Sequence, residues 1–223
     1  MTRHANFRRT YYKSLGVPVL QSVEVEASFA SLLGEDTPTP AITINLSQLV
    51  RLTLEFGLPA VHRSHVWCIA SHIFPLVRDA EADTWGFVRN ERRIMYVDIA
   101  AAADVCEAPQ TELSITRRLI HLHRFYVDCV RPNLHSMLST LDEAECATEW
   151  VLGDVRVVES VAVAVQQVLD ETSDQFWCLV AFLDILDRGF HSLQPPVPVE
   201  ELYDISPLAL EIIIFRLLAL ACS

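Results

Sequence analysis

The stretch that decides the fold reads Leu54-Glu-Phe-Gly-Leu-Pro-Ala-Val-His-Arg-Ser-His-Val-Trp-Cys-Ile-Ala-Ser-His-Ile-Phe-Pro-Leu76. Gly57 and Pro59 interrupt any preceding helix, and proline is tolerated in a first helical turn because its missing N–H has no partner there. The apolar residues that follow are spaced as on one face of a helix. Since Pro75 disfavours helical backbone in the residue before it, we expect a short, largely buried helix that ends at or near Phe74.

Arg63 and Trp67 are the side chains of this helix that can do more than pack. They lie four positions apart, so they share a face, and the guanidinium can reach the indole ring or a nearby carboxylate. Most amphipathic helices only pack, so the residues alone indicate a core helix with a structurally anchored arginine.

The composition favours one compact helical domain. The chain has 223 residues, of which 51% are hydrophobic and 21% are charged, and this is ample for one core. Only 6 glycines are present, and charged residues interrupt the apolar runs, which favours helices over a turn-rich sandwich. A proline-containing loop at residues 34–40 predicts a boundary between an N-terminal helical arm and loop, residues 1–40, and a helical domain, residues 41–223.

Hydrophobic periodicity predicts an all-α chain. The valine-rich segment 155–169 could be a strand by β-branching, but its length and its charges without strict alternation favour a buried helix. Gly189 is expected to end the predicted helix at residues 175–186. A short N-terminal helix capped by Asn6 and an acidic linker over residues 139–154 are also expected. The other predicted helices cover residues 23–33, 47–56, 90–105, 113–129, 175–186 and 207–222.

The charge and the apolar pattern exclude several partners. A formal net charge of −12 argues against nucleic acid, because a phosphate-binding surface needs clustered Lys and Arg. The most apolar stretch, residues 207–222, is too short for a transmembrane span and carries Glu211 and Arg216, so we expect a core helix there. Residues 1–20 have no continuous apolar region, and the six cysteines form no Cys-x-x-Cys pair. A reduced, cytoplasmic protein is therefore expected.

The histidines do not indicate a metal site. His62 and His65 share a helix face, with His72 further along, but a site needs three or four ligands and no acidic partner is evident. His121 and His123 point to different faces. Solvated or core histidines explain all five, so neither a metal nor a cofactor is expected.

Other catalytic arrangements are equally weak. Asp98 with Asp104, and Asp184 with Asp187, are explained better as solvated helix faces than as paired catalytic carboxylates. The sequence contains no Gly-x-Ser-x-Gly elbow, no glycine-rich phosphate loop and no Rossmann glycine pattern. The residues by themselves therefore predict no enzyme active site.

Two motifs, in this order, resemble the TBC domain, the fold of Rab GTPase-activating proteins. The first is Gly57-Leu-Pro59 followed by Arg63 and Val66-Trp67, and the second is Asp174-Gln-Phe-Trp177. The second is similar to the family's acidic-x-Phe-Trp helix, in which an aromatic pair, here Phe176 and Trp177, locks two helical lobes. The resemblance implies a multi-helix TBC-type domain.

A further likeness covers roughly residues 6–206. Asn6-Phe-Arg-Arg-Thr-Tyr-Tyr12 and Met95-Tyr-Val-Asp98 are similar to segments of a small member of that family, the third subunit of the tuberous sclerosis complex. This resemblance implies binding to the coiled coil of hamartin, a part in restraining the small GTPase Rheb in growth signalling, and association with lysosomal or vesicle membranes through partners. A full domain of the family continues for several helices past residue 206, so the last lobe is expected to be truncated or altered.

The catalytic signature of the family is not found at the matching positions. Active members have an arginine in Ile-x-x-Asp-x-x-Arg and a glutamine in Tyr-x-Gln, which would neutralise charge on the transferred phosphoryl group and orient the attacking water. Here Asp98 is followed by Ile-Ala-Ala-Ala, and the segment before the valine-rich helix reads Gly153-Asp-Val-Arg-Val157. The resemblance therefore implies a non-catalytic adaptor.

Two alternatives remain. One is a working Rab GTPase activator with Arg93 or Arg117 as a surrogate finger, which requires an arginine and a glutamine to converge on one groove. The other is a helical interaction protein unrelated to GTPases. It would be favoured if the Arg63/Trp67 helix and the Phe176/Trp177 helix did not pack in one domain.

Overall fold

The structure is a computed structural model that describes residues 19–35, 41–79, 81–106, 113–132, 153–190 and 197–221. The predicted N-terminal helix capped by Asn6 lies outside the described residues. The loop at 36–40 and residues 139–152 of the predicted linker lie outside them as well.

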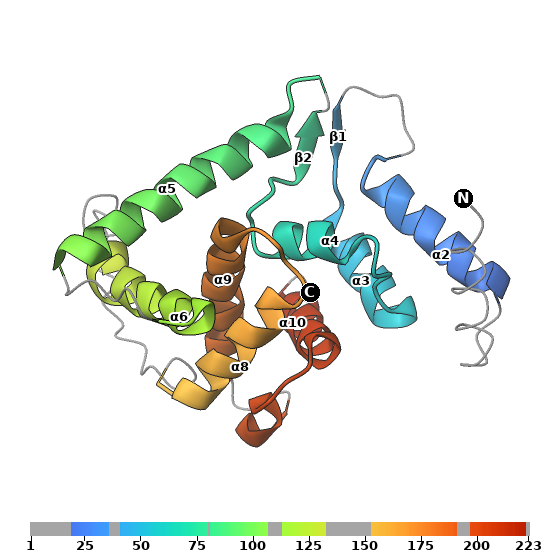
Figure 1. Ribbon diagram of the computed structural model, residues 1–223. Coiled ribbons are helices and arrows are strands. Elements are labelled where there is room, and N and C mark those ends of the chain that lie inside the picture. Colours follow the sequence, from blue (N-terminus) through green and yellow to red (C-terminus); the bar gives the residue numbers. More distant parts are fainter. Residues whose placement is uncertain are drawn as a thin grey trace.

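The described chain is dominated by helices, so the all-α prediction is confirmed (Figure 1). A π-helical turn, η1 (Tyr126–Val130), follows α6, and a 3₁₀ turn, η2 (Val199–Leu202), precedes α10. The helices are α2 (Val19–Leu32), α3 (Leu46–Phe56), α4 (Arg63–Ala70), α5 (Thr84–Cys106), α6 (Ile115–Phe125), α8 (Val155–Gln166), α9 (Thr172–Phe190) and α10 (Pro207–Ala221). The valine-rich segment is thus a helix, as its length indicated.

A two-stranded ribbon was not predicted. Strand β1 (Ala41–Thr43) pairs antiparallel with β2 (Val77–Asp79), with Ile42 opposite Arg78. Strands of three residues are too short to show a period of two in the sequence. The guanidinium of Arg78 also donates to the carbonyl oxygen of Leu33 at 2.7 Å, so the ribbon ties the end of α2 to the start of α5.

Helix α9 is the centre of the fold. It is buried along nearly its whole length, from Ser173 to Phe190, as expected for a helix that is apolar all round. Helices α4, α5, α6, α8 and α10 all contact it (Figure 1). Helix α10 is the predicted core helix near the end of the chain, and it packs on α3, α8 and α9. The core is therefore assembled from both halves of the sequence.

Helix α4 ends four residues earlier than predicted. His72 adopts a left-handed conformation with φ of 56°, and the N–H of Ile73 donates to the carbonyl of Cys68 at 2.8 Å. The N–H of His72 donates to the carbonyl of Ile69 at 3.0 Å. This Schellman motif satisfies the last carbonyls and stops the helix at Ala70, before Pro75 has any effect.

Other boundaries also differ from the predictions, among them those of α5 and α9. Helix α5 begins at Thr84, six residues before the predicted start, and includes Trp85 and Gly86. Gly189 lies inside α9 rather than ending it. A Cβ atom on Gly189 would lie 2.4 Å from Cδ2 of Leu217, so the glycine allows α9 and α10 to approach closely.

Candidate functional site

Arg63 and Trp67 meet a third residue that the sequence did not connect with them. The carboxylate of Glu211 on α10 is 1% exposed, and its Oε2 accepts hydrogen bonds from Arg63 Nε at 2.9 Å and from Trp67 Nε1 at 3.0 Å. Arg63 also donates to the carbonyl of Leu58, in the turn between Gly57 and Pro59, at 3.1 Å. Burial raises the pKa of Glu211, while its two donors oppose that shift. The motif thus anchors α10 to the start of α4.

The second motif forms the junction between α9 and the helices beside it. The rings of Phe176 and Trp177 lie edge to face at 5.0 Å, and Tyr126 contacts both rings. The indole N–H of Trp177 donates to the carbonyl of Arg92 on α5 at 2.9 Å. Trp67 contacts Phe182 with ring centroids 5.1 Å apart, so the helices of both motifs pack in one core.

Asp174 is fully buried and pairs with an arginine of α5. Its Oδ2 accepts hydrogen bonds from Arg89, one of them from Nε at 2.7 Å, and this contact raises the pKa of the Arg89 guanidinium. The other oxygen, Oδ1, has no hydrogen-bond partner within the described part of the chain. The ion pair joins α5 to the start of α9.

The proposed surrogate fingers lie on the surface of two different helices. Arg93 on α5 is exposed and donates to Asn90 of the same helix at 3.1 Å. Arg117 on α6 is also exposed, and its backbone N–H donates to the capping hydroxyl of Ser114. Neither contact involves a glutamine, and their role as fingers remains a prediction.

An arginine and a glutamine do line one groove, but the arginine is neither Arg93 nor Arg117. Arg156 and Gln167 border a groove of about 500 Å³ between α8 and the start of α10. Arg156 donates to the hydroxyl of Tyr203 at 2.8 Å, and its guanidinium lies 3.9 Å from the centre of that ring. The hydroxyl in turn donates to Asp154 at 2.7 Å, which lowers the pKa of Asp154.

Two expectations about the histidines and the carboxylates need correction. Glu35, at the end of α2, lies 3.6 Å from Nδ1 of both His62 and His65, so these histidines do have an acidic neighbour. Burial lowers the pKa of His65, and Glu35 opposes that effect. Among the described residues, no group of three or more His, Cys, Asp or Glu side chains is arranged to hold a metal ion. Asp184 is paired with Arg131, and Asp187 is 9% exposed, so these two carboxylates are not a solvated face.

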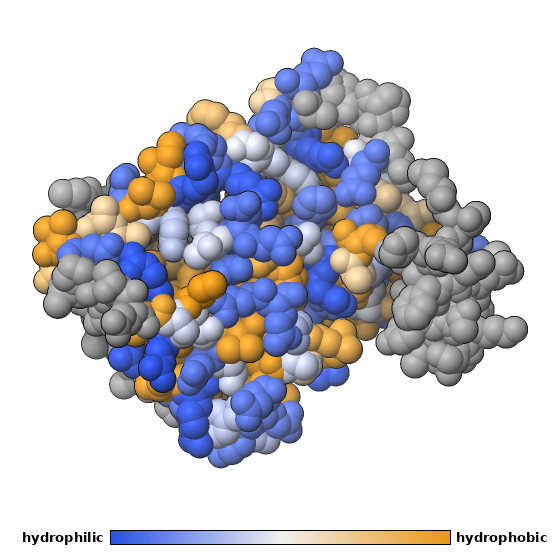
Figure 2. Space-filling view, in the orientation of Figure 1, coloured by the Kyte–Doolittle hydropathy of each residue, from blue (hydrophilic) through white to orange (hydrophobic). Residues whose placement is uncertain are grey.

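The most unusual surface lies on α5. This helix has 23 residues, yet only Ile99 and Ala103 are buried. Its outer side has an apolar stripe that consists of Phe87, Ile94, Val97, Ala101 and Val105. Phe87 is 66% exposed, Val97 56% and Val105 86%. We call these five residues the α5 stripe, and Figure 2 shows apolar atoms along the edge of the molecule where α5 lies.

The stripe has the spacing of a coiled-coil seam. Phe87, Ile94 and Ala101 recur every seven residues, and Val97 follows Ile94 by three. These residues supply three a positions and one d position of the pattern by which one helix packs along another. The other two d positions are polar, Asn90 and Asp104. At 100° per residue the stripe lies on the side of α5 opposite to the buried Ile99 and Ala103.

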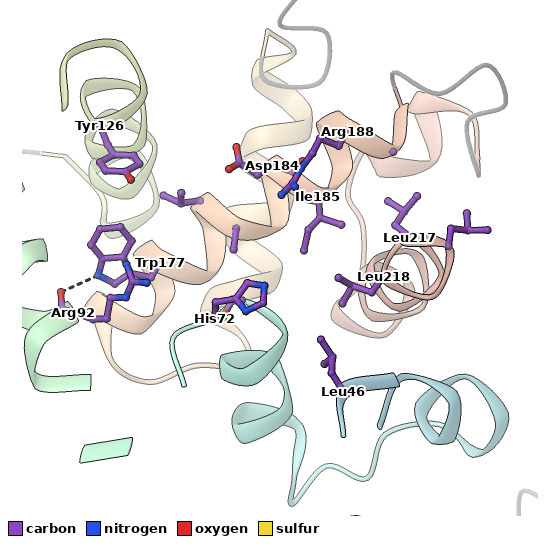
Figure 3. Close-up of a pocket in the computed structure, with 15 residues that line it drawn as sticks. Leu46, His72, Arg92, Tyr126, Trp177, Asp184, Ile185, Arg188, Leu217 and Leu218 are labelled. Carbon is purple, nitrogen blue, oxygen red and sulfur yellow. Dashed lines mark hydrogen bonds between the residues drawn. The ribbon is translucent and has the colours of Figure 1, made fainter. Parts of the chain in front are cut away.

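A second apolar surface follows α9. A groove of about 630 Å³ runs between α9 and α10, and the ends of α3 and α4 border it (Figure 3). We call it the α9–α10 groove. Its charged lining residues are Arg92, Asp184 and Arg188, and His72 also borders it. Its apolar lining includes Trp177, Val180, Ala181, Ile185, Leu217 and Leu218.

Two curated relatives of the chain carry the TBC domain in their names. The chain is similar to a TBC1-domain protein. TBC1 domain family member 7 of Danio rerio is 26% identical to it over 200 residues, and that of Bos taurus is 22% identical over 198 residues. Each alignment covers 86% of this chain and 57% of the relative, so the chain spans little more than half the length of the curated relatives it matches. No protein-family model and no solved structure matches the chain.

The structure bears on one further expectation. Within the described residues, no helix combines the length and the hydropathy that crossing a bilayer requires. Helix α10 is the most apolar one, and it packs against the protein core through Leu210, Ile214 and Phe215.

Proposed function

We propose that this chain is a TBC-type domain that acts as a non-catalytic adaptor in small-GTPase signalling, with a coiled coil like that of hamartin as its partner. In that role it would support a cytoplasmic complex that restrains Rheb. The observation that carries the proposal is the α5 stripe, an exposed heptad pattern on a long helix. The similarity to TBC1 domain family member 7 supports it at the level of the family.

The stripe fits a helical partner because of its geometry. A helix of 23 residues is about 34 Å long, so a partner helix could pack beside it over several heptads. Phe87 is 66% exposed and Ile94 45%, so burying the rest of each side chain contributes roughly 1–2 kcal/mol. Exposed charges beside the stripe, Glu91 and Asp98 among them, would set the register of the partner through its own charged positions.

The same helix supports the non-catalytic part of the proposal. Ala101 stands three positions after Asp98, where the family resemblance would require the finger arginine, and it is exposed on the α5 stripe. A methyl group there can pack in a coiled-coil seam, but it cannot neutralise charge on a phosphoryl group.

The groove with Arg156 and Gln167 is what favours the second candidate, a working GTPase activator. An arginine and a glutamine are the residue types that phosphoryl transfer to water needs. Two contacts speak against this use. Arg156 is already bonded to Tyr203, and the carboxylates of Glu159 and Asp204 line the same groove, where they would repel a nucleotide phosphate.

One preparation can test both functions. The full chain is co-purified with a hamartin coiled-coil fragment, and GTP hydrolysis by a panel of Rab proteins is followed on the same sample. We expect stable co-elution without acceleration of hydrolysis. The double variant Ile94→Asp/Val97→Asp should abolish co-elution, because two carboxylates would be buried in the seam. Val155→Asp, an exposed valine on α8, is the matched control and should bind normally.

The opposite outcome is equally clear. Hydrolysis that is accelerated by the wild-type chain, and is lost on replacing Arg156, Arg93 or Arg117, would identify an activator. Combined with a failure to co-elute, it would overturn the adaptor proposal.

A further inference from the structure

We propose that the α9–α10 groove is a second docking site, and that it binds an amphipathic helix of a protein partner whose apolar face is flanked by acidic residues. This site is distinct from the α5 stripe, and the proposal does not depend on the partner of that stripe. It rests on the length, the lining and the charge of the groove.

The length of the groove matches a short helix. Residues of α9 line it from Trp177 to Gly189, a distance of about 18 Å along the helix axis. About three turns of a partner helix would lie along this distance. Such a segment presents apolar side chains at i, i+3, i+4 and i+7, which is the usual spacing for helices that bind in grooves.

The lining offers an apolar floor with room for these side chains. Ala181 is a small, half-buried residue in the middle of α9, with Val180 and Ile185 close to it in sequence. Leu217 and Leu218 of α10 form the opposite wall (Figure 3). Trp177, which is 4% exposed, closes the end of the groove where Arg92 lies.

The charge at the groove selects the partner. The chain as a whole is strongly acidic, with a net charge of −12. Among the described residues that line the groove, Asp184 is the only carboxylate, and Arg131 pairs with it at 2.8 Å. Arg188 is exposed, and its Nε donates to the carbonyl of Asp184. The guanidinium of Arg92 lies over the Trp177 ring at 4.8 Å. The groove thus has a basic rim, which favours an acidic partner over a basic one.

Designed peptides test this directly. Two fluorescein-labelled helical peptides of about 18 residues carry the same leucines at i, i+3, i+4 and i+7, and their flanking positions are all Glu in one and all Lys in the other. Fluorescence anisotropy against the full chain measures both affinities. We expect the Glu peptide to bind roughly tenfold more tightly than the Lys peptide.

Variants assign the binding to the groove. Arg188→Glu should reduce or reverse the preference for the Glu peptide, because it reverses one charge of the rim. Arg117→Glu makes the same charge change on α6, outside the groove residues, and should leave both affinities unchanged. Ala181→Trp should fill the floor and abolish binding, with thermal unfolding by circular dichroism as the check that the chain still folds.

Three outcomes would overturn the proposal. The first is equal affinity for the two peptides, and the second is binding that neither Arg188→Glu nor Ala181→Trp weakens. The third is laurate that binds more tightly than the Glu peptide and is lost in Ala181→Trp, since this would make the groove a site for a small amphiphile.

Discussion

A single carboxylate, Glu211, joins the beginning of the core to its end. Its Oε2 accepts hydrogen bonds from Arg63 and Trp67, which lie 148 and 144 residues away in the sequence. Burying a carboxylate is costly unless it is paired and hydrogen-bonded, and here both conditions are met. The motif that looked like a feature of one helix is therefore a contact between two helices.

Removal of this acceptor should be costly. Glu211→Ala leaves the Trp67 indole N–H and the Arg63 guanidinium without their shared acceptor, and we expect a loss of roughly 3 kcal/mol in the free energy of unfolding. Glu211→Gln keeps an acceptor oxygen, so its loss in the free energy of unfolding should be clearly smaller. Urea unfolding at pH 7 measures both variants. A loss for Glu211→Ala below about 0.5 kcal/mol would mean that the contact does not hold α10 in place.

His123 should make stability depend on pH. The side chain is 4% exposed, and burial lowers its pKa from 6.5 to about 4. Between pH 6.5 and about pH 4, His123 is therefore neutral in the folded chain and protonated in the unfolded chain. The stability that results is present above pH 6.5 and is lost as the pH falls toward 4.

The pH effect can be isolated with one variant. Between pH 7 and pH 4, the free energy of unfolding of the wild-type chain should fall by about 3 kcal/mol more than that of His123→Leu. The acidic groups titrate in both proteins, so their contribution cancels in this difference. Urea unfolding at the two pH values measures the difference. Identical losses in the two proteins would show that His123 accepts a proton without unfolding the chain.

At the scale of the element, two helices end in the same way with different residues. Helix α2 ends at Leu32, and Gly34 follows it in a left-handed conformation with φ of 68°. The N–H of Glu35 donates to the carbonyl of Ala30 at 2.9 Å. Helix α4 has the same Schellman arrangement, but His72 takes the left-handed position. Glycine adopts this conformation without strain, whereas a residue with a Cβ pays about 1 kcal/mol.

Substitutions at the two helix ends should change the stability of the fold in opposite directions. Gly34→Ala adds backbone strain and places a Cβ 2.2 Å from Cδ1 of Ile42, so we expect a loss of about 2 kcal/mol. His72→Gly removes the strain at an exposed position and should raise stability by about 0.5–1 kcal/mol. Gly34→Ala in an Ile42→Ala background is the control for strain without a clash, because the atoms that the added Cβ would meet are then absent. Thermal unfolding ranks the variants, and an equal loss for Gly34→Ala in the two backgrounds would rule out the clash.

Helix α5 also shows how one element can serve two purposes. Its inner side packs on α9 through Ile99 and Ala103, while Arg89 reaches the buried Asp174. Its outer side carries the α5 stripe, which no described residue covers, as the exposure of Phe87 and Val105 shows. The described part of the fold packs on the first side, and the proposed partner would bind the second.

At the scale of the whole molecule, thiol chemistry should report on the core. Cys68 and Cys178 are buried, and burial raises the pKa of the Cys68 thiol to about 12. Cys106, at the end of α5, is exposed. We expect iodoacetamide to modify Cys106 in the native protein, and Cys68 and Cys178 only when the chain unfolds.

Mass spectrometry of digested samples measures this difference. Alkylation of Cys68 and Cys178 should begin together at the urea concentration where the chain unfolds, because both lie in one core between α4 and α9. Modification of Cys68 in native buffer at the rate of Cys106 would show that α4 separates from α9 without global unfolding.

The spacing of apolar residues predicted most of the helices but did not assign the candidate functional site. Periodicity located α3, α8 and α10, since each spans enough residues for its buried face to recur. It missed the β1–β2 ribbon because each strand has only three residues. It also placed the end of α4 at or near Phe74, because a left-handed histidine at position 72 has no reliable signature in a single sequence. The division of the chain at residue 40 remains a prediction.

The sequence by itself determined the helical class, the order of the Arg63/Trp67 and Phe176/Trp177 motifs, and the likeness to a TBC domain. These depend on residue type and short spacing, which can be read along the chain. Only the tertiary structure decided that Glu211 joins the first motif, that one side of α5 stays exposed, and that a basic rim borders the α9–α10 groove. Each of these depends on segments far apart in the chain that are brought together by burial of the common core, and short spacing contains no information about such contacts.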